Sequence, residues 1–226
     1  MKSLGIIIPV YNEEKNIVKL LNQWLKIIPK YYKKKYKLFI LNDGSTDRTH
    51  QKIKHIKHKS IYYIKQKNIG HGNSCLKGYK LALKNNCEII FQIDSDHQCD
   101  PKYFKFFLKS IKKNEAVFGY RIKREDGYLR KIFSHILSIL IFLKTFTFVK
   151  DSNVPYRMIK KDVLRKVIYQ IPEKVILKNV YLSYLIQKKY KIEWIDINFR
   201  KRIFGKTNYN FINLIYMTLN LIFNLR

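Results

Sequence analysis

Acidic side chains are scarce in this chain of 226 residues, in which 16 Asp and Glu stand against 46 Lys and Arg, for a formal net charge of +30. A field of that sign favours an anionic partner over a cationic one, whether nucleic acid, an anionic bilayer or a phosphorylated substrate. Composition alone does not choose among these three. A lineage rich in lysine, isoleucine and asparagine would account for part of the excess.

Cysteine is rare as well. The sequence has three cysteines, Cys75, Cys87 and Cys99. Their number is odd and their spacing is too wide for a zinc knuckle, so we expect reduced thiols in a cytosolic protein. No signal peptide is expected, because the apolar run of residues 4–10 is short, contains Pro9 and is followed at once by polar residues.

Long apolar runs are missing too. A membrane-spanning helix needs about 20 predominantly apolar residues, and no segment reaches that length without interruption. Residues 132–149 come near it but include His135 and Lys144, and residues 211–225 are short and contain three asparagines. We expect both segments to form helices that lie on a membrane or pack in the core.

The sequence does have what a folded α/β domain needs. Its 46% apolar content is ordinary for a protein with a core, and its length fits one domain. Strand and helix patterns alternate in the first half. We expect strands over residues 4–10, 36–41, 61–64, 88–93 and 116–120, and helices over residues 13–28, 47–56, 71–83 and 101–113. This alternation predicts an α/β fold with a mostly parallel sheet and helices on both faces.

The second half is less regular. Its patterns predict helices over residues 128–149 and 175–189, a short helix from residue 161, strands over residues 154–159 and 192–199, and an apolar tail from about residue 209. No internal repeat and no clear domain boundary is evident.

Polar clusters follow several predicted strands, at residues 11–13, 42–47 and 94–98 and at Arg121. Ligands of such sheets collect at the carboxyl ends of the strands. In Asp94-Ser95-Asp96-His97-Gln98, side chains two apart on an extended segment point the same way. Asp94, Asp96 and Gln98 can therefore offer oxygen atoms to one Mg²⁺ or Mn²⁺ ion.

Other interpretations of these clusters stay open. Asp94 and Asp96 also suit a solvated, helix-capping turn, and a haloacid-dehalogenase phosphatase has a similar motif, although that motif normally lies near the N-terminus. Residues 42–47 suit a strand-to-helix turn capped by Thr46 or Asp47. In Asn68-x-Gly70-x-Gly72, the glycines allow either a close approach to a phosphate or tight packing.

Taken together, four motifs in order resemble family 2 glycosyltransferases of the GT-A fold. The motifs are Ile8-Pro9-Val10-Tyr11-Asn12-Glu13, Asn42-Asp43-Gly44-Ser45-Thr46-Asp47, Asn68-x-Gly70-x-Gly72 with Gly78 and Ala82, and Asp94-x-Asp96-x-Gln98 with Asp100-Pro101. The second half resembles the dolichyl- or polyprenyl-phosphate branch of that family. Its matching residues are Gly119-Tyr120-Arg121, Arg130-x-x-x-Ser134, Val154-Pro155-Tyr156-Arg157 and Arg200-Lys201-Arg202-x-x-Gly205-Lys206-Thr207.

The resemblance implies roles for individual residues. The nucleotide-sugar, a UDP- or GDP-hexose, would be bound by Pro9, Tyr11, Glu13, Asn42, Asp43, Gly70 and Asp94. Asp94, Asp96 and Gln98 would hold Mg²⁺ or Mn²⁺. Arg121, Arg130, Ser134 and Arg202 would bind the phosphate of a polyprenyl-phosphate acceptor, and Asp96, Arg121 and Arg202 would act in catalysis.

The same resemblance implies a GT-A domain over residues 1–208, with a nucleotide-sugar half (1–120) and an acceptor half (121–208), followed by an apolar helix over residues 209–226 that associates with a membrane. We expect a cytoplasmic protein bound peripherally to the inner face of a membrane, and no nucleic-acid partner. A basic nucleic-acid-binding protein is the alternative from another class.

Two departures from the family pattern matter. Asn42 stands where an aspartate is common, and no acidic residue lies between Glu173 and Glu193, where many members carry a catalytic base. A hydroxyl acceptor needs a general base, whereas a phosphate acceptor is already anionic. The sequence thus favours inverting transfer of a hexose to a polyprenyl phosphate, with a saccharide or glycolipid hydroxyl as the alternative acceptor.

Overall fold

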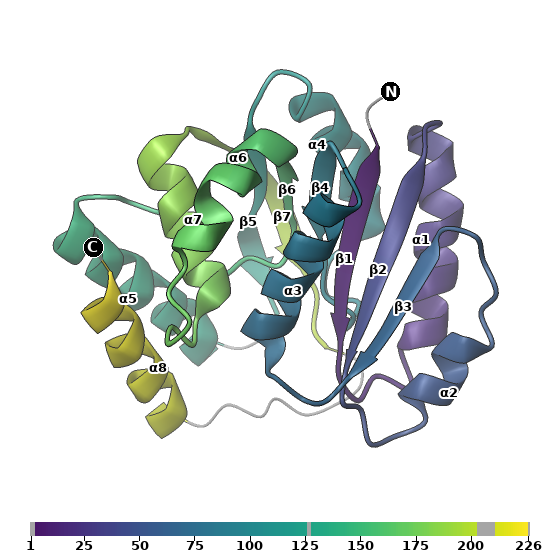
Figure 1. Cartoon of the computed structure of the whole chain (residues 1–226). Helices are drawn as coiled ribbons and strands as arrows, with labels where there is room; N and C mark the ends of the chain where they lie inside the picture. Colours follow the sequence, from purple (N-terminus) through teal and green to yellow (C-terminus); the bar gives the residue numbers. More distant parts are fainter. Residues whose placement is uncertain (1–2, 126–127, 203–210, 226) are drawn as a thin grey trace.

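The computed structural model describes residues 3–125, 128–202 and 211–225, in which seven strands form one sheet in the order β3-β2-β1-β4-β6-β5-β7 (Figure 1). The strands are β1 (Leu4–Val10), β2 (Tyr36–Asp43), β3 (Ile61–Gln66), β4 (Ile89–Gln92), β5 (Ala116–Arg124), β6 (Arg157–Lys160) and β7 (Ile192–Phe199). All neighbours pair in parallel except β6, which is antiparallel to both β4 and β5. The predicted α/β fold with a mostly parallel sheet is confirmed.

Helices cover both faces of this sheet. They are α1 (Ile17–Tyr31), α2 (Thr49–Lys54), α3 (His71–Lys84), α4 (Phe104–Ser110), α5 (Tyr128–Thr145), α6 (Lys161–Val167), α7 (Lys178–Lys189) and α8 (Phe211–Asn224), with single 3-10 turns η1 (Pro101–Tyr103) and η2 (Ile168–Gln170). On one face α1 contacts α2 and α4, and on the other α3 contacts α6 and α7. The remaining pair, α5 and α8, contact each other at one end of the molecule (Figure 1).

Strand β1 forms the centre of the core, and all seven of its residues are buried. Helix α1 packs over this region with an apolar face that includes Trp24. The Trp24 ring meets Phe91 and Phe104 edge to face, with centroids 5.8 and 5.6 Å apart, a favoured geometry for aromatic pairs. An uninterrupted apolar strand between two neighbours therefore anchors the loops that follow it.

Helix α3 approaches the opposite side of β1 closely at Gly78. A Cβ atom on this glycine would lie 2.4 Å from Cγ2 of Ile7. The lack of a side chain at residue 78 thus lets α3 lie against the strand, which fixes the start of the helix near the ends of β1 and β4.

Several predicted boundaries were wrong by a few residues. Helix α1 starts at Ile17 and not at residue 13, because the backbone N–H groups of Glu13 and Glu14 are held by Thr49 Oγ1 and Asp47 Oδ2. Helix α5 stops at Thr145 instead of continuing to residue 149, since Phe146 adopts a left-handed φ of 53°.

The two predicted halves share one sheet. Strand β6 belongs to the second half of the chain but lies between β4 and β5, and the expected division at residue 120 falls inside β5. The expected boundary at residues 208–209 lies outside the described residues. Among the described helices, none combines the length and the apolarity needed to cross a bilayer.

Candidate active site

The polar loops gather at one edge of the sheet. Strands β2, β1 and β4 are parallel neighbours, so the segments that follow Asp43, Val10 and Gln92 leave the sheet side by side, at the lower edge in Figure 1. This is the carboxyl edge at which α/β sheets bind ligands.

The loops after β1 and β2 hold each other in place. Asn12, with a left-handed φ of 54°, donates its N–H to Ser45 Oγ at 3.0 Å and accepts from the N–H of Thr46 at 2.8 Å. Asp47 Oδ1 accepts from the N–H of Thr49, the first residue of α2, at 2.9 Å, but the N-cap position itself is Arg48 and not Thr46 or Asp47 as predicted. These bonds join two predicted motifs into one rigid wall.

Asn42 and Asp43 lie at the end of β2 and face inward. Asn42 is fully buried; its amide donates to the Tyr63 hydroxyl at 2.8 Å and accepts from the N–H of Ser45 at 3.0 Å. Asp43 Oδ1 accepts from Gln66 Nε2 and from the N–H of Ile69, both at 2.9 Å. Both side chains therefore organise the loops around the predicted nucleoside site.

The other predicted nucleoside residues differ in exposure. Pro9 is buried within β1, opposite Leu41, whereas the Tyr11 side chain is 38% exposed. Gly70 precedes α3 with a φ of 86°, and no atom lies within 4 Å of where its Cβ would be. The first N–H groups of a helix can bind an anion, and this open glycine leaves the approach to them clear.

The acidic pair follows β4. Asp94 Oδ1 is buried and has no hydrogen-bond partner among the described residues, although His71 Nε2 lies 3.7 Å away. Asp96 Oδ1 accepts from the N–H of Gln98 at 3.1 Å. Burial, and next the negative charge of Asp94, raise the pKa of Asp96 to about 6. Two carboxylates that repel each other, one with an unsatisfied oxygen, fit a divalent cation between them.

Gln98 is oriented differently from the two aspartates. Its side chain is buried and donates from Nε2 to the Arg200 carbonyl at 2.9 Å, so it ties the acidic loop to the segment after β7. No group of three Cys, His, Asp or Glu side chains in the described part of the chain is close enough to hold a metal ion unaided. A cation on Asp94 and Asp96 would need further oxygen ligands from a substrate.

Glu13 forms an ion pair with Arg202, a contact that the sequence did not indicate. Arg202 Nη2 lies 2.5 Å from Glu13 Oε1, and Asn16 Nδ2 donates to Glu13 Oε2 at 2.6 Å. Burial raises the pKa of Glu13 to about 7, against the opposing effects of Asn16 and Arg202. The positive charge of Arg202 also acts on Asp96, so one arginine serves the loops after both β1 and β4.

Arg121 also has a buried acidic partner. Its Nε and Nη2 donate to the two oxygens of Asp151 at 2.7 and 2.6 Å, and its guanidinium lies 5.0 Å from the centre of the Phe199 ring. Both side chains of the pair are at most 7% exposed. Sequence reasoning missed Asp151; the only signal was a polar stretch, Lys150-Asp151-Ser152-Asn153, after an apolar helix.

Helix α7 approaches the neighbourhood of the acidic pair through Asn179, its second residue. Asn179 is buried, and its Nδ2 lies 3.4 Å from both His71 Nε2 and Cys75 Sγ. His71 in turn lies beside Asp94. The contact that α7 makes with this site is thus an amide, which agrees with the lack of acidic residues noted in this stretch.

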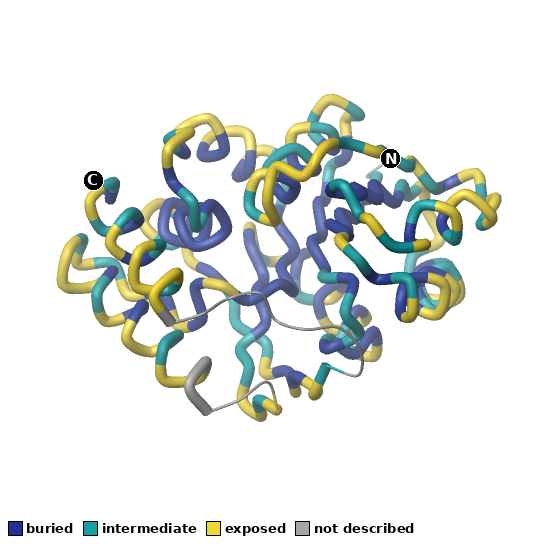
Figure 2. Tube along the Cα trace, turned by 90° about the horizontal axis from the view of Figure 1, so that it is seen from below, coloured by how far each residue is buried: buried dark blue, intermediate teal, exposed yellow. Residues whose placement is uncertain are grey.

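The remaining predicted acceptor residues lie on α5. Ser134 is half-buried, and the side chain of Arg130 lies outside the described residues, as do Gly205, Lys206 and Thr207. Helices α5 and α8, and the residue that follows α5, expose large apolar side chains, among them Leu143, Phe146, Tyr216 and Phe223 at 66, 86, 63 and 83%. Figure 2 shows exposed positions along both helices, beside the buried strands.

Comparison with known proteins identifies relatives along most of the chain. A model of glycosyl transferase family 2 matches residues 5–170. An uncharacterised protein of Methanocaldococcus jannaschii is 33% identical over 172 residues, covering 70% of this chain and 72% of that protein. An undecaprenyl-phosphate 4-deoxy-4-formamido-L-arabinose transferase of Photorhabdus laumondii is 24% identical over 227 residues, covering 98% of this chain and 67% of that protein.

Solved structures share the fold at low identity. Glucosyl-3-phosphoglycerate synthase from Mycobacterium tuberculosis, in complex with Mn²⁺, UDP-glucose and glycerol 3-phosphate, has a TM-score of 0.69 at 14% identity, covering 99% of this chain and 80% of that one. S. aureus TarS 1–349 with UDP-GlcNAc has a TM-score of 0.66 at 19% identity, covering 98% of this chain and 65% of that one. These likenesses confirm the GT-A fold. The chain spans about two thirds of the arabinose transferase and of the TarS chain. Since the family model matches well over half of its length, the chain belongs to glycosyl transferase family 2.

Proposed function

We propose that this protein is an inverting, metal-dependent glycosyltransferase that moves a hexose from a nucleotide-sugar to a polyprenyl phosphate at a membrane surface. The observation that carries the proposal is Oδ1 of Asp94, a buried atom that accepts no hydrogen bond within the described residues and lies at the carboxyl end of β4, close to Asp96 and to the start of α3. A buried carboxylate oxygen without a partner is costly unless a ligand satisfies it.

Asp94 and Asp96 are the residues that would hold the metal, Mg²⁺ or Mn²⁺, because hard cations prefer oxygen ligands. When bound, such an ion supplies positive charge that stabilises a departing nucleoside diphosphate. Gln98 is assigned a supporting role, because its amide nitrogen is already engaged with the Arg200 carbonyl.

The donor would lie over the loops after β1 and β2. Asp43 and the exposed Tyr11 ring flank this surface, with Pro9 beneath it and Gly70 clearing the path of the phosphates to the helix N-terminus. Asn42 is assigned as a positioning residue, because both ends of its amide are bonded within the protein. Asn42 is bonded to Tyr63, a residue outside the four sequence motifs, so Tyr63 would also help to shape the site of the nucleotide base.

The acceptor assignment rests on the missing base. Only the neutral amide of Asn179 extends from the start of α7 towards His71 and Asp94, so a hydroxyl acceptor would have no carboxylate there to take its proton. A phosphate oxygen needs positioning by cations instead. Arg202 is paired with Glu13, but its side chain is 26% exposed and lies near Asp96, so it is suited to that task. The side chain of Arg121 is 7% exposed and paired with Asp151, and we assign Arg121 to holding the loop at residues 150–153. The arabinose transferase relatives are named for an undecaprenyl-phosphate acceptor.

The acceptor oxygen would attack the anomeric carbon on the face opposite the bond to the donor phosphate. The new glycosyl–phosphate bond forms as that bond breaks, the nucleoside diphosphate leaves with the electron pair, and no proton transfer is needed. A single displacement of this kind inverts the anomeric centre.

The membrane side would be the exposed apolar surface of α5 and α8. Apolar helices on a surface partition into the bilayer interface, and lysines near anionic lipids add about 1 kcal/mol each. We propose a peripheral location on the cytoplasmic face. The wild-type chain should float with anionic liposomes and be released by salt, whereas Phe146→Asp with Phe223→Asp should stay unbound. Flotation of the double variant to the wild-type extent would refute this orientation.

The donor assignment is tested with UDP- and GDP-sugars, measured by thermal shift with Mn²⁺ and with EDTA. We expect stabilisation by one nucleotide class that requires the metal and disappears in Asp96→Ala, while the variant keeps its circular dichroism spectrum. A folded Asp96→Ala protein that still shows the Mn²⁺-dependent shift would refute the metal site.

The acceptor is tested with the same sugar donor and two acceptors, a polyprenyl phosphate and the corresponding polyprenol. We expect product with the polyprenyl phosphate alone. NMR of this product should show that the anomeric configuration is inverted relative to the donor. Transfer to hydroxyl acceptors alone would support the saccharide or glycolipid alternative and end the phosphate assignment.

A further inference from the structure

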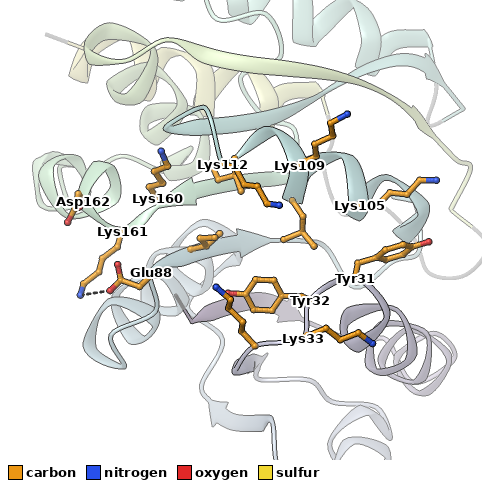
Figure 3. Close-up of a pocket in the computed structure, with 14 residues that line it drawn as sticks. Tyr31, Tyr32, Lys33, Glu88, Lys105, Lys109, Lys112, Lys160, Lys161 and Asp162 are labelled. Atoms are coloured by element: carbon orange, nitrogen blue, oxygen red, sulfur yellow. Dashed lines mark hydrogen bonds and ion pairs between the residues drawn. The ribbon is translucent and has the colours of Figure 1, made fainter. Parts of the chain in front are cut away.

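A hollow of about 510 Å³, drawn in Figure 3, lies beside the first residue of β4. Its wall includes Ile89, the first residue of β4, whereas Asp94 follows the other end of that strand. At about 3.3 Å per residue the two positions are roughly 16 Å apart along the chain. The hollow is therefore separate from the candidate active site.

Lysines from three distant segments converge on this hollow. Two come from the turn after α1, three from α4 and its continuation, and two from the β6–α6 junction: Lys33, Lys34, Lys105, Lys109, Lys112, Lys160 and Lys161. In Figure 3, Lys112 lies near the middle, with Lys160 and Lys161 on one side and Lys105 and Lys109 on the other. The fold, and not one basic stretch of sequence, thus builds the cluster.

The lysines of α4 recur at a helical spacing. Lys105, Lys109 and Lys112 are four and three residues apart, which places them on one face of the helix and its final turn. The opposite face of α4 is buried against the core through Phe104, Phe107 and Leu108. The backbone of this basic face is therefore fixed at the rim of the hollow; in Figure 3 Lys112 points towards the middle, while Lys105 and Lys109 extend outward from the rim.

Negative charge near these lysines is insufficient to balance them. Glu88 and Asp162 are the acidic residues of the lining, and Glu88 accepts from Lys161 Nζ at 3.2 Å. Within the described part of the chain, the other six lysines have no carboxylate in ion-pair range. A cluster of like charges around a concavity is favourable for an anionic ligand.

The floor of the hollow is apolar. Ile89, Leu108 and Ile111 are buried beneath it at 8, 9 and 1% exposure, and the half-buried ring of Tyr32 lies at its centre in Figure 3. A bare inorganic anion would gain nothing from such a floor, whereas a flat ring or an aliphatic group would be desolvated on it.

We propose that this hollow binds a small molecule that carries several phosphate groups on an aromatic or apolar body. Its volume lies within the range of roughly 300–1,000 Å³ typical of small-molecule sites, and lysine ammonium groups bind phosphates as point charges. A single-stranded nucleic acid needs an extended basic track with stacking platforms, whereas these lysines surround one hollow. The apolar helices α5 and α8 lie at a different end of the molecule (Figure 1), so a membrane bound there would not fill this site.

ATP is a suitable probe because it combines three phosphates with an aromatic base. Binding is measured by calorimetry on the full chain in EDTA at about 0.15 M salt, where charges farther than roughly 8 Å from the ligand are largely screened. Tripolyphosphate, which has the phosphates without the base, and adenosine, which has the base without phosphates, measure the contribution of each part of ATP to binding. We expect saturable binding of one ATP, weaker binding of tripolyphosphate and no binding of adenosine.

Two charge-matched variants locate the site. Lys105→Gln with Lys109→Gln and Lys112→Gln removes three exposed lysines of the hollow, and Lys54→Gln with Lys57→Gln and Lys59→Gln removes three exposed lysines around α2 and β3. The first set should weaken ATP binding by about tenfold or more, and the second by less than about twofold. Asp96→Ala should bind ATP like the wild type, and the first variant should keep its Mn²⁺-dependent response to the nucleotide-sugar.

Each contrary result overturns the proposal. Equal weakening in the two lysine variants would mean attraction by net charge alone. Loss of ATP binding in Asp96→Ala would mean that the probe occupies the donor site. If tripolyphosphate bound as tightly as ATP, the apolar part of the ligand would not contribute to binding. If no saturable ATP binding were seen, the hollow would not be a binding site. The same data leave the glycosyltransferase assignment untouched, since that depends on Mn²⁺ and the acidic pair.

Discussion

Arg202 Nη2 lies 2.5 Å from Glu13 Oε1, although the two residues are 189 positions apart in the chain. Glu13 is 5% exposed, and it follows the central strand of the sheet, whereas Arg202 follows the last strand. The ion pair therefore joins the loop after β1 to the segment after β7 at the candidate active site. It also places the positively charged guanidinium of Arg202 near Asp96.

Arg202→Ala should reduce transfer by about 100-fold, because loss of one preorganised charged donor typically has an effect of that size. Arg202→Lys should retain part of the activity. The measurement is kcat with the polyprenyl phosphate at saturating nucleotide-sugar. Arg200→Ala is the matched control, since Arg200 is paired with Asp100 and is 53% exposed. Equal losses in both variants would contradict a specific role for Arg202.

Glu13→Gln should flatten the dependence of stability on pH. Burial raises the pKa of Glu13 from 4.5 to about 7, so between these values the folded state binds more protons than the unfolded state. The free energy of unfolding should then fall as the pH rises from about 4.5 to 7, by roughly 2 kcal/mol for this one group. Urea unfolding at pH 5 and pH 8 in EDTA measures the slope. Glu115→Gln, at an exposed position, should leave the wild-type slope unchanged, and a Glu13→Gln protein with that slope would contradict the assignment.

Much of this arrangement could be predicted from local patterns. The run at residues 4–10 is apolar throughout because β1 has a neighbour on each side, and the polar residues after it mark the end of a parallel strand. The acidic pair and its strand-end location followed from the same reasoning. Boundaries such as the late start of α1 could not be predicted, because side chains from the next loop, Thr49 and Asp47, decide them.

Pairings between residues that are far apart in the chain could not be predicted from the sequence either. Arg121 was predicted to meet a phosphate, and nothing in its local sequence indicated that Asp151 would meet it first. Asn42 was likewise expected to contact a nucleoside directly, but Tyr63, from the next strand, engages its amide. Motif reasoning identifies which residues are near a site, and the partners that set their charge and orientation become visible only in three dimensions.

The buried pair of Arg121 and Asp151 leads to a stability prediction. Asp151→Asn leaves a buried guanidinium without its counter-charge and should cost about 3–5 kcal/mol in the free energy of unfolding. Arg121→Met combined with Asp151→Leu should cost much less than the sum of the single changes, because no charge remains to be solvated. Urea unfolding of Arg121→Met, Asp151→Leu and the double variant, beside the wild type, forms the test, and strictly additive losses would contradict a direct, desolvated ion pair.

Gly78→Ala should destabilise the protein by about 1–3 kcal/mol, a typical cost of overpacking. The added methyl group would lie 2.4 Å from Cγ2 of Ile7, so α3 must move away from β1. Combining it with Ile7→Ala, which removes that Cγ2 atom, should give a loss smaller than the sum of the two single losses. Thermal unfolding of the four proteins measures this, and additive losses would mean that the two positions do not meet.

Asn179→Asp tests whether the neutral amide at the start of α7 matters for the choice of acceptor. The change is nearly isosteric, and the new carboxylate would lie near His71, whose Nε2 is 3.7 Å from Asp94. Negative charge there would repel a phosphate acceptor, so KM for a polyprenyl phosphate should rise by about tenfold while donor binding persists. A hydroxyl acceptor would respond in the opposite direction, since a carboxylate can accept its proton and assist attack. Kinetics with the phosphate and the polyprenol side by side separate the two cases. Faster transfer to the polyprenol, with no penalty on the phosphate, would mean that the wild-type amide is not an adaptation to an anionic acceptor.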